Sequence, residues 1–442
     1  MLSGWGRTAP SPARVVIPGR VEQIRAAVSA AGPRGILARG LGRAYGDAAQ
    51  NAGGSVLDMT ACAAIRSFDV PNGLITADAG LSLHQLMRAV LPFGWFPPVT
   101  PGTRMVTLGG AVAADVHGKN HHVSGGFTNH VTEFDLVTAD GALSTVLPGS
   151  ELFAATAGGM GLTGVITSVT LRLLPVRSSL MTVDTERVGH LDVLMDRLKS
   201  GDHHYRYSVA WIDLLARGSA MGRAVITRGD HAPAEALPPA ARRDPLLFRP
   251  SSLPGAPHLP GGLLRPSTVR AFNQLWYRKA PRFRRDELQT ISTFFHPLDG
   301  LPDWNRIYGP AGFLQYQFVV ADGQEETLRR IVERISRASC PTFLAVLKRF
   351  GPAGPGWLSF PVPGWTLALD LPTRTPGLNA LLDELDSWVA EAGGRVYLAK
   401  DSRLRPATLR AMYPRLDDFR SLRRALDPNG VFTSDLARRL AL

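Results

Sequence analysis

Hydrophobic positions recur with helical and strand spacing in turn over the first part of the chain. Val21, Ile24 and Val28 repeat every three or four positions and stop at Gly32, which predicts a short amphipathic helix. A second helix is predicted from Ser82 to Pro92. Apolar runs predict a strand leading into a glycine loop at 35–47, strands at 55–59, 74–77 and 165–174, and a hairpin of 134–138 with 143–147. This alternation indicates an α/β arrangement.

Longer alternating strands are typical of the chain after about residue 175. They are predicted at 207–215, 313–320, 341–350, 365–372 and 395–400, with helices at 324–336 and 378–389. Residues 231–268 hold nine of the 34 prolines with little periodicity, which predicts a long, mobile loop. The second part is therefore predicted to be a mixed sheet-and-helix domain.

Several of these strands place polar side chains on one face. In the strand at 313–320, Gln315 and Gln317 share a face, while the opposite face is apolar core. By the same alternation, Lys348 aligns with Leu344 and Val346, and Lys400 aligns with Val396 and Leu398. Amides and ammonium groups on a sheet face form either its solvated side or the polar floor of a ligand site. Periodicity alone favours the solvated side.

Length and composition place the chain among ordinary globular proteins. Its 442 residues predict two or three domains, and 45% hydrophobic with 19% charged residues exclude general disorder. No run approaches the roughly 18 apolar residues that span a bilayer, and residues 1–18 lack the apolar core of a signal peptide. A soluble protein retained in the cytoplasm is expected. Cys62 and Cys340 lie far apart, outside any CxxC motif, and are expected to be reduced packing residues.

The net charge of +12 raises nucleic acid or an anionic surface as a partner. No nucleic-acid reader motif accompanies the scattered basic residues, so no nucleic acid is expected. A basic face towards anionic lipid or a phosphorylated substrate stays open. Only five of the 49 basic residues are lysines, so Lys119, Lys348 and Lys400, which lie among polar and glycine-rich residues, are candidates for a deprotonatable amine. The alternative is that these three lysines are ordinary surface residues without a chemical role.

Residues 159–164 match GxGxxG, but the order of the surrounding elements argues against a dinucleotide fingerprint. That fingerprint follows a strand and opens a helix. Here a helix-like segment, 151–157, precedes the glycines and a strand follows them. A tight turn beside another segment or a ligand is the simpler interpretation.

Two other glycine-rich segments are more informative: ARGLGRAYGD at 38–47 and PGTRMVTLGGAVAADVHGKNHH at 101–122. Backbone N–H groups in such loops can cradle a pyrophosphate, and neither loop carries the GK[ST] of an ATPase. Together they predict one extended cofactor held from two sides. The histidines of the second loop lack metal-ligand spacing, since adjacent His121 and His122 do not point the same way, and no metal is expected.

Taken together, several segments resemble the decaprenylphosphoryl-β-D-ribose 2′-oxidase family, the flavoprotein half of an epimerase for the arabinose donor of actinobacterial cell walls. They are ARGLGRAYGDAAQNAGG, PGTRMVTLGGAVAADVHGKNHH, QLWYRKA, YGPAGFLQYQF, LSFPVPGW and YLAKDSR. The resemblance runs from Gly4 to the tail SDLARRL, essentially the whole chain.

The resemblance implies an α+β, vanillyl-alcohol-oxidase type two-domain fold. Residues 1–178 would form the N-terminal part of an FAD-binding PCMH-type domain. Residues 179–394 would form a mixed sheet-and-helix substrate domain with the mobile proline-rich loop at 231–268. Residues 395–442 would return as a C-terminal segment to the FAD domain.

The cofactor that the resemblance implies is FAD. The residues carried over are Ala38, Arg39, Gly40, Leu41, Gly42, Arg43, Ala44, Tyr45, Gly46, Asp47, Ala48, Gly102, Thr107, Leu108, Gly109, Gly110, Ala114, Asp115, Val116, His117, Ile166 and Tyr397. Arg43 stands where many relatives carry the histidine that tethers FAD, so non-covalent FAD is expected.

The substrate implied by the resemblance is a polyprenyl-phosphoryl ribose, oxidised by hydride transfer from C2′ to the flavin as a base accepts the hydroxyl proton. Lys400 is the first candidate to position or deprotonate that hydroxyl, and partial burial would favour its neutral amine. His117 and Tyr45 are the other catalytic candidates. The substrate-binding candidates are Gln315, Gln317, Lys348, Trp211, Lys119 and Ala368. Ala368 stands where mycobacterial members carry cysteine, so thiol-directed inhibitors are not expected to trap it.

The resemblance also implies partners. A separate NAD(P)H-dependent keto-reductase would reduce the 2′-keto product to the arabinose configuration. A lipid substrate implies peripheral binding at the inner membrane, on its cytoplasmic face or alternatively its periplasmic face. A soluble aldonolactone or alditol oxidase of the same fold is the alternative function, and a non-catalytic basic protein on membranes or nucleic acid is a third.

Overall fold

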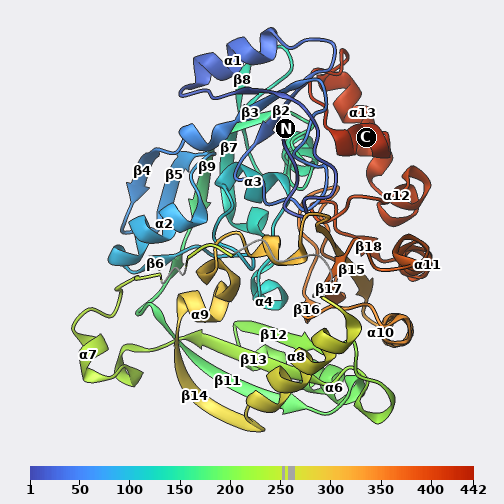
Figure 1. Cartoon of the computed structure of the whole chain (residues 1–442). Coiled ribbons are helices and arrows are strands. Elements are labelled where there is room, and N and C mark those ends of the chain that lie inside the picture. The colour runs from blue at the N-terminus through green and yellow to red at the C-terminus, as the bar shows by residue number, and fades with distance from the viewer. Residues whose placement is uncertain (251–253, 257–263) are drawn as a thin grey trace.

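Two large antiparallel sheets, one small parallel sheet and one two-stranded antiparallel sheet organise the described chain (Figure 1). The computed structural model describes residues 1–250, 254–256 and 264–442. In Figure 1 the N-terminal sheets and the C-terminal helices lie together above the large second sheet. Among the described helices, none combines the length and the apolarity needed to cross a bilayer.

The N-terminal part follows the predicted alternation of helices and strands. Its three-stranded sheet is parallel, with order β1-β3-β2, and contains β1 (Arg14–Val16), β2 (Ile36–Arg39) and β3 (Ser55–Asp58) beside α1 (Val21–Ser29). The five-stranded sheet has order β4-β5-β9-β7-β8, with β4 (Ile65–Asp69), β5 (Leu74–Asp78), β7 (Val131–Val137), β8 (Leu143–Val146) and β9 (Val165–Arg172). The predicted hairpin is confirmed as the β7–β8 pair.

Short helices cover this sheet and carry the second glycine-rich loop. Helix α2 (Leu83–Val90) begins at Ser82, whose hydroxyl accepts from the Gln85 N–H in a capping box. It buries the apolar face that its spacing predicts. The other elements here are β6 (Trp95–Phe96), α3 (Leu108–Ala113), α4 (His121–Ser124), α5 (Glu151–Thr156) and β10 (Leu174–Pro175).

The second sheet has eight antiparallel strands in the order β14-β11-β13-β12-β16-β17-β15-β18. Its strands are β11 (Leu180–Val188), β12 (Tyr207–Ile212), β13 (Ala224–His231), β14 (Phe283–Thr290), β15 (Phe313–Ala321), β16 (Ala345–Phe350), β17 (Gly364–Pro372) and β18 (Arg395–Val396). Helices α6 (Leu191–Gly201), α10 (Glu325–Ala338) and α11 (Leu378–Glu391) pack on it through one large core cluster. The opposite face of β12, β15, β16 and β17 is left to line a cavity.

Two predictions need correction. The strand predicted at 395–400 ends at Val396, because the chain then turns and the N–H of Lys400 donates to the carbonyl of Tyr397 at 2.9 Å. The proline-rich segment 231–268 is not one continuous loop, since α7 (Pro239–Arg242) lies in it and α8 (Pro266–Lys279) begins at its end. Each begins at a proline, which suits the first helical position. Mobility of the segment stays a prediction, and residues 251–253 and 257–263 lie outside the described residues.

The C-terminal segment lies against the N-terminal part (Figure 1). The segment contains α12 (Pro406–Met412), α13 (Leu416–Leu426) and α14 (Asp435–Leu440). Helix α9 (Ile291–Phe295) lies earlier, directly after β14. Phe432 forms a parallel bridge with Ile36. Arg439 on α14 lies 2.8 Å from the carboxylate of Asp47 and 2.9 Å from that of Asp401. These contacts hold the turn that carries Lys400 beside the first glycine loop.

Candidate functional site

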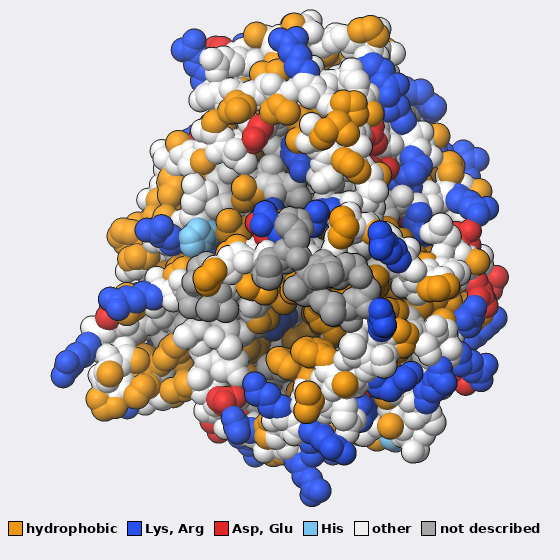
Figure 2. Space-filling model, viewed as in Figure 1, with side chains coloured by type: hydrophobic (Ala, Val, Ile, Leu, Met, Phe, Trp, Pro, Cys, Tyr) orange, Lys and Arg blue, Asp and Glu red, His pale blue; other side chains and the backbone are white. Residues whose placement is uncertain are grey.

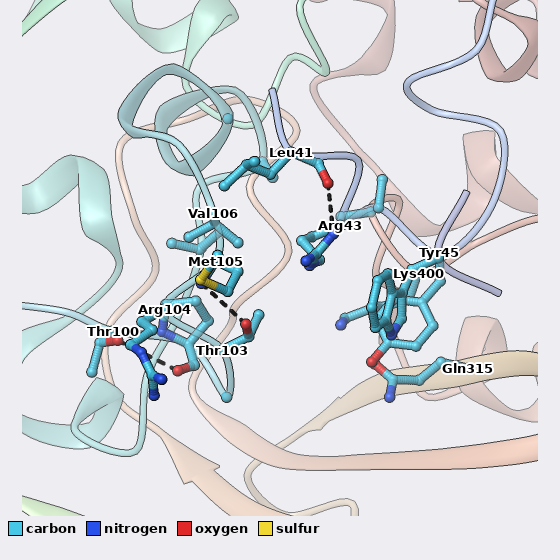
Figure 3. A pocket seen from close by; sticks show the side chains of 18 of the residues that line it. Leu41, Arg43, Tyr45, Thr100, Thr103, Arg104, Met105, Val106, Gln315 and Lys400 are labelled. Carbon is cyan, nitrogen blue, oxygen red and sulfur yellow. Dashed lines mark hydrogen bonds between the residues drawn. The ribbon is translucent and has the colours of Figure 1, made fainter. Parts of the chain in front are cut away.

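A cavity of about 970 Å³ lies where the glycine-rich loops, the face of the second sheet and the turn at 397–400 meet. Figure 3 shows Tyr45, Lys400 and Gln315 together on one side of it, with Thr100 to Val106 on the other and Leu41 and Arg43 between them. Every substrate-binding and catalytic candidate from the sequence lines this cavity: Tyr45, His117, Lys119, Trp211, Gln315, Gln317, Lys348, Ala368 and Lys400.

Most of the predicted cofactor residues also line the cavity, and four do not: Gly46, Asp47, Leu108 and Asp115. Leu108 is the first residue of α3 and belongs to the hydrophobic core. Asp115 is fully buried and accepts hydrogen bonds from the hydroxyls of Thr128, at 2.7 Å, and Ser359, at 2.5 Å. Asp47 pairs with Arg439, and Gly46 packs against the Asp401 carbonyl. These four residues contact neighbouring segments and do not face the cavity.

The first glycine loop presents a row of unused donors to the cavity. The backbone N–H groups of Leu41, Gly42, Arg43 and Ala44 donate no hydrogen bond to any described part of the chain. The two loops also approach closely, since a Cβ on Gly40 would lie 2.2 Å from the hydroxyl oxygen of Thr107. Consecutive unpaired backbone N–H groups, next to a place where two loops meet without an intervening side chain, form a concave site for an anion.

The segment after Thr100 forms the facing wall and is tied to a distant part of the chain. Asp299 accepts from the Thr103 hydroxyl at 2.6 Å and from the N–H of Arg104 at 2.8 Å. The Arg104 guanidinium is buried and donates to Nδ1 of His84 at 3.1 Å. Although this segment belongs to a glycine-rich motif, Asp299 and His84 carry no sequence signal that connects them to it.

Lys400 sits in a cluster whose charges are interdependent. Its Nζ lies 3.8 Å from the centre of the Tyr45 ring. Burial lowers the pKa of Lys400 to about 7, with Lys348 acting in the same direction and Asp370 in the opposite one. Asp370 on β17 is fully buried and accepts from Gln315 at 2.5 Å and from the hydroxyl of Tyr308 at 3.1 Å. Burial raises the pKa of Asp370 to about 7. Lys400 is therefore available as a neutral amine near neutral pH.

A chain of hydrogen bonds defines the protonation state of His117. The Thr366 hydroxyl donates to the Phe318 carbonyl at 2.9 Å, so its oxygen accepts from Nε2 of Gln317 at 3.2 Å. The same amide nitrogen donates to Nε2 of His117 at 3.0 Å. The proton of the neutral ring is then on Nδ1, which donates to Nζ of Lys348 at 3.2 Å.

That direction requires Lys348 to accept as a neutral amine. Burial lowers the pKa of Lys348 to about 8. Burial and then the Lys348 charge lower the pKa of His117 well below its usual value. The second shift keeps His117 neutral, whereas a pKa of about 8 leaves Lys348 mainly protonated at pH 7, so the neutral pair forms only above about pH 8.

Lys119 supplies a third amine at the far end of the floor. Its Nζ donates to the Phe294 carbonyl and lies 4.2 Å from the centre of that ring. Burial lowers the pKa of Lys119 to about 7. Three lysines with lowered pKa values thus face one cavity, which is the environment that tunes amines for proton transfer.

The prediction that the amide and ammonium face is solvated is wrong. Gln315, Gln317 and Lys348 line the cavity, and Gln317 is only 2% exposed. Alternation along a strand is the same whether the polar face meets water or a closed site, so periodicity does not distinguish the two. The tight turn at 159–164 also reaches the cavity, through Gly161 and Gly164.

Sequence reasoning missed the aromatic mouth of the cavity. It contains Trp5, Phe272, Trp276, Trp304 and Phe343. Trp276 belongs to the QLWYRKA motif and Phe272 lies one turn before it on α8, but Trp5, Trp304 and Phe343 come from separate segments without a shared pattern. Among the described residues no group of His, Cys, Asp or Glu side chains is arranged to hold a metal ion.

Comparisons with known proteins agree with this geometry. A family model described as an FAD binding domain matches residues 12–146, and one described as D-arabinono-1,4-lactone oxidase matches residues 323–440. This pair of domains confirms the vanillyl-alcohol-oxidase type fold and FAD as the cofactor.

Individual relatives differ in how similar they are. The chain is 46% identical to decaprenylphosphoryl-beta-D-ribose oxidase of Mycolicibacterium smegmatis, over 100% of this chain and 97% of that one. It is 24% identical to L-gulono-1,4-lactone dehydrogenase of Mycobacterium tuberculosis, over 99% and 98%. It is 26% identical to an alditol oxidase of Streptomyces, over 88% and 86%. The resemblance seen in the motifs is thereby confirmed: the chain belongs to the decaprenylphosphoryl-β-D-ribose oxidase family of FAD-binding oxidases.

Proposed function

We propose that this protein oxidises the 2′-hydroxyl of a polyprenyl-phosphoryl-β-D-ribose to the 2′-ketone, with FAD as the cofactor. The observation that carries the proposal is the cavity floor, where Lys400, Lys348, His117 and Gln317 face the same space beside the glycine loop. The name of the relative from M. smegmatis supports the substrate class.

The loops fit FAD. The unpaired N–H groups of 41–44 would hold its pyrophosphate, and the close approach of Gly40 to Thr107 leaves the cradle without side chains. When bound, FAD supplies the acceptor for the hydride that leaves C2′. We infer that it is bound without a covalent link, because residues 38–48 contain no histidine and the Arg43 guanidinium donates to the Leu41 carbonyl at 2.7 Å.

The side chains of the floor provide the remaining chemistry. Gln315 and Gln317 offer amides that orient a sugar, and the hydrogen-bonded His117 and Lys348 add an imidazole and an amine beside them. Lys400 takes the proton of the 2′-hydroxyl as the neutral amine that its burial favours. Proton and hydride leave the same carbinol, so the base must be held close to the reacting carbon.

The aromatic mouth favours a lipid substrate over a small lactone. Trp5, Phe272, Trp276 and Trp304 extend the cavity beyond the space that a pentose fills. Aldonolactones and alditols have no apolar part to occupy it. The lower identity to the lactone and alditol enzymes points the same way.

We further propose the setting of this reaction. The 2′-ketone has to be reduced on its other face to give the arabinose configuration for arabinan and cell-wall synthesis, which calls for an NAD(P)H-dependent keto-reductase as the partner subunit of an epimerase. A substrate held in lipid calls for a peripheral position at the inner membrane, on its cytoplasmic or alternatively its periplasmic face.

The test is to mix the purified holoprotein anaerobically with polyprenyl-phosphoryl ribose or with an aldonolactone and to follow the flavin absorbance. Bleaching by the ribolipid alone is the expected result. Bleaching by the lactone alone would assign the function to the alternative. A protein that takes up no FAD would overturn the cofactor and the reaction together.

The pH dependence tests the role of Lys400. A base works only when deprotonated, so the rate of flavin bleaching is expected to rise as pH increases through about 7 and then to level off. Asp370 raises the pKa of Lys400, so Asp370→Asn should move the midpoint to lower pH. Stopped-flow rates between pH 5 and 9, a range of about two units either side of the midpoint, measure both curves. A variant that is slower by the same factor at every pH would assign Asp370 a purely structural role.

A further inference from the structure

Helix α8 exposes three large apolar side chains on one face. Phe272 is 44% exposed, Leu275 70% and Trp276 45%. Their positions, three and four residues apart, place them side by side on the helix surface. The rings of Phe272 and Trp276 stack with centroids 6.1 Å apart. A cluster of large apolar side chains in water is unusual for a protein surface and marks a contact site.

The same face is continuous with the cavity. Phe272 and Trp276 both line the cavity, and the Phe272 ring meets Phe343, a second lining residue, edge to face at 5.8 Å. Leu275 does not line the cavity. The apolar surface therefore runs from the outside of the protein, across α8, into the aromatic mouth.

Positively charged residues come directly after this face in the sequence. Residues 278–285 contain five cations: Arg278, Lys279, Arg282, Arg284 and Arg285. Nζ of Lys279 lies 5.9 Å from the centre of the Trp276 ring. Within the described chain, no carboxylate pairs with Arg278, Lys279 or Arg282. Figure 2 shows hydrophobic side chains interleaved with lysine and arginine over the region of α8.

We propose that the exposed face of α8 docks this protein on an anionic lipid bilayer, with the cavity mouth against the lipid. Aromatic and aliphatic side chains enter the boundary between headgroups and acyl chains, while flanking cations bind the anionic headgroups. Both halves of that pattern are present within the twenty residues 266–285.

Two observations favour lipid as the occupant: the cations that flank the α8 face, and the continuity of that face with the cavity. The argument from continuity rests on the proposed function. A prenyl tail loses hydrophobic stabilisation with every methylene that enters water. A mouth placed against the bilayer lets the tail stay in lipid or on Phe272 and Trp276 while the sugar reaches the floor. A soluble protein partner would require neither the unpaired cations nor the opening into the cavity.

The experiment compares holoprotein variants in sedimentation with vesicles of phosphatidylglycerol and phosphatidylcholine. Leu275→Glu is expected to weaken binding at least tenfold, because it places an anion in the centre of the apolar face. The matched control is Leu147→Glu, since Leu147 is 55% exposed and lies just after β8, in the other sheet. Lys279→Glu is expected to weaken binding several-fold at low salt and to reduce its salt dependence.

A second readout separates docking from catalysis. Flavin bleaching by a short-chain, water-soluble prenylphosphoryl ribose without vesicles is expected to be unchanged in Leu275→Glu. Equal vesicle binding by Leu275→Glu and Leu147→Glu, or no binding by the unmodified protein, would overturn the docking proposal even if bleaching is normal. Binding that depends on α8 without any bleaching would keep the docking surface and reject the proposed function.

Discussion

Lys400→Met is expected to slow flavin bleaching by polyprenyl-phosphoryl ribose about 10³-fold, within the range that a positioned general base contributes. The substitution removes the amine that lies over the Tyr45 ring and keeps an unbranched chain in this half-buried site, while the backbone contacts in the 397–401 turn remain. FAD content should not change, and it is measured by releasing the cofactor with heat and filtering the protein away.

Two further variants make the result specific. Lys400→Arg retains the positive charge but cannot lose a proton near neutral pH, so it should be nearly as slow as Lys400→Met if the amine is a base. An active Lys400→Arg would assign Lys400 to positioning alone. Lys199→Met removes an exposed lysine on α6 and should leave the rate unchanged. Near-normal bleaching in Lys400→Met would reject both roles.

Gly46→Ala is expected to destabilise the protein by about 3 kcal/mol, at the upper end of the usual cost of overpacking. A Cβ at this position would lie 1.9 Å from the carbonyl oxygen of Asp401, a backbone atom that no side-chain rotation can move. The first glycine loop and the 397–401 turn would have to separate. Because the unpaired N–H groups of 41–44 adjoin this contact, FAD affinity should fall about tenfold or more.

Urea unfolding and FAD titration of the apoprotein measure the two effects of Gly46→Ala. Gly189→Ala is the matched control, since a Cβ on Gly189 would meet no atom within 4 Å. Equal urea midpoints for the two variants would show that the chain relaxes at Gly46 without cost. Unchanged FAD affinity in a destabilised Gly46→Ala would show that the cradle does not depend on this contact.

The elements that were predicted correctly are those that local chemistry determines. Helix α2 combines a serine cap, a glutamine three residues later and one apolar face, all within nine positions. The β7–β8 hairpin has Asp140-Gly141 at its turn, where Gly141 has a φ of +77°. Turn geometry and helical periodicity each act over a few residues, so both can be recognised before the fold is known.

The end of β18 shows where local pattern fails. Alternation continues through 396–400, but pairing with β15 stops at Val396 and the backbone folds into a turn. The direction of Lys400 is therefore decided by hydrogen bonds from its own backbone and not by strand spacing. Its neighbours Tyr45 and Asp370 come from segments 355 and 30 residues away in sequence.

The sequence by itself determined many of the helices and strands, though not α6, α8, β11, β13 or β14. It also determined the two glycine-rich loops, FAD as the expected cofactor and the family, because each depends on residues close together or on motifs read in order. Tertiary structure alone decided that the amide face of β15 meets a cavity, that Asp299 ties down a segment 195 residues away, and that α8 opens its aromatic face to solvent. A polar residue every second position satisfies water and a closed site equally well. Only the packing of distant segments determines which of the two it faces, and that packing also sets the burial that lowers the pKa of each cavity lysine.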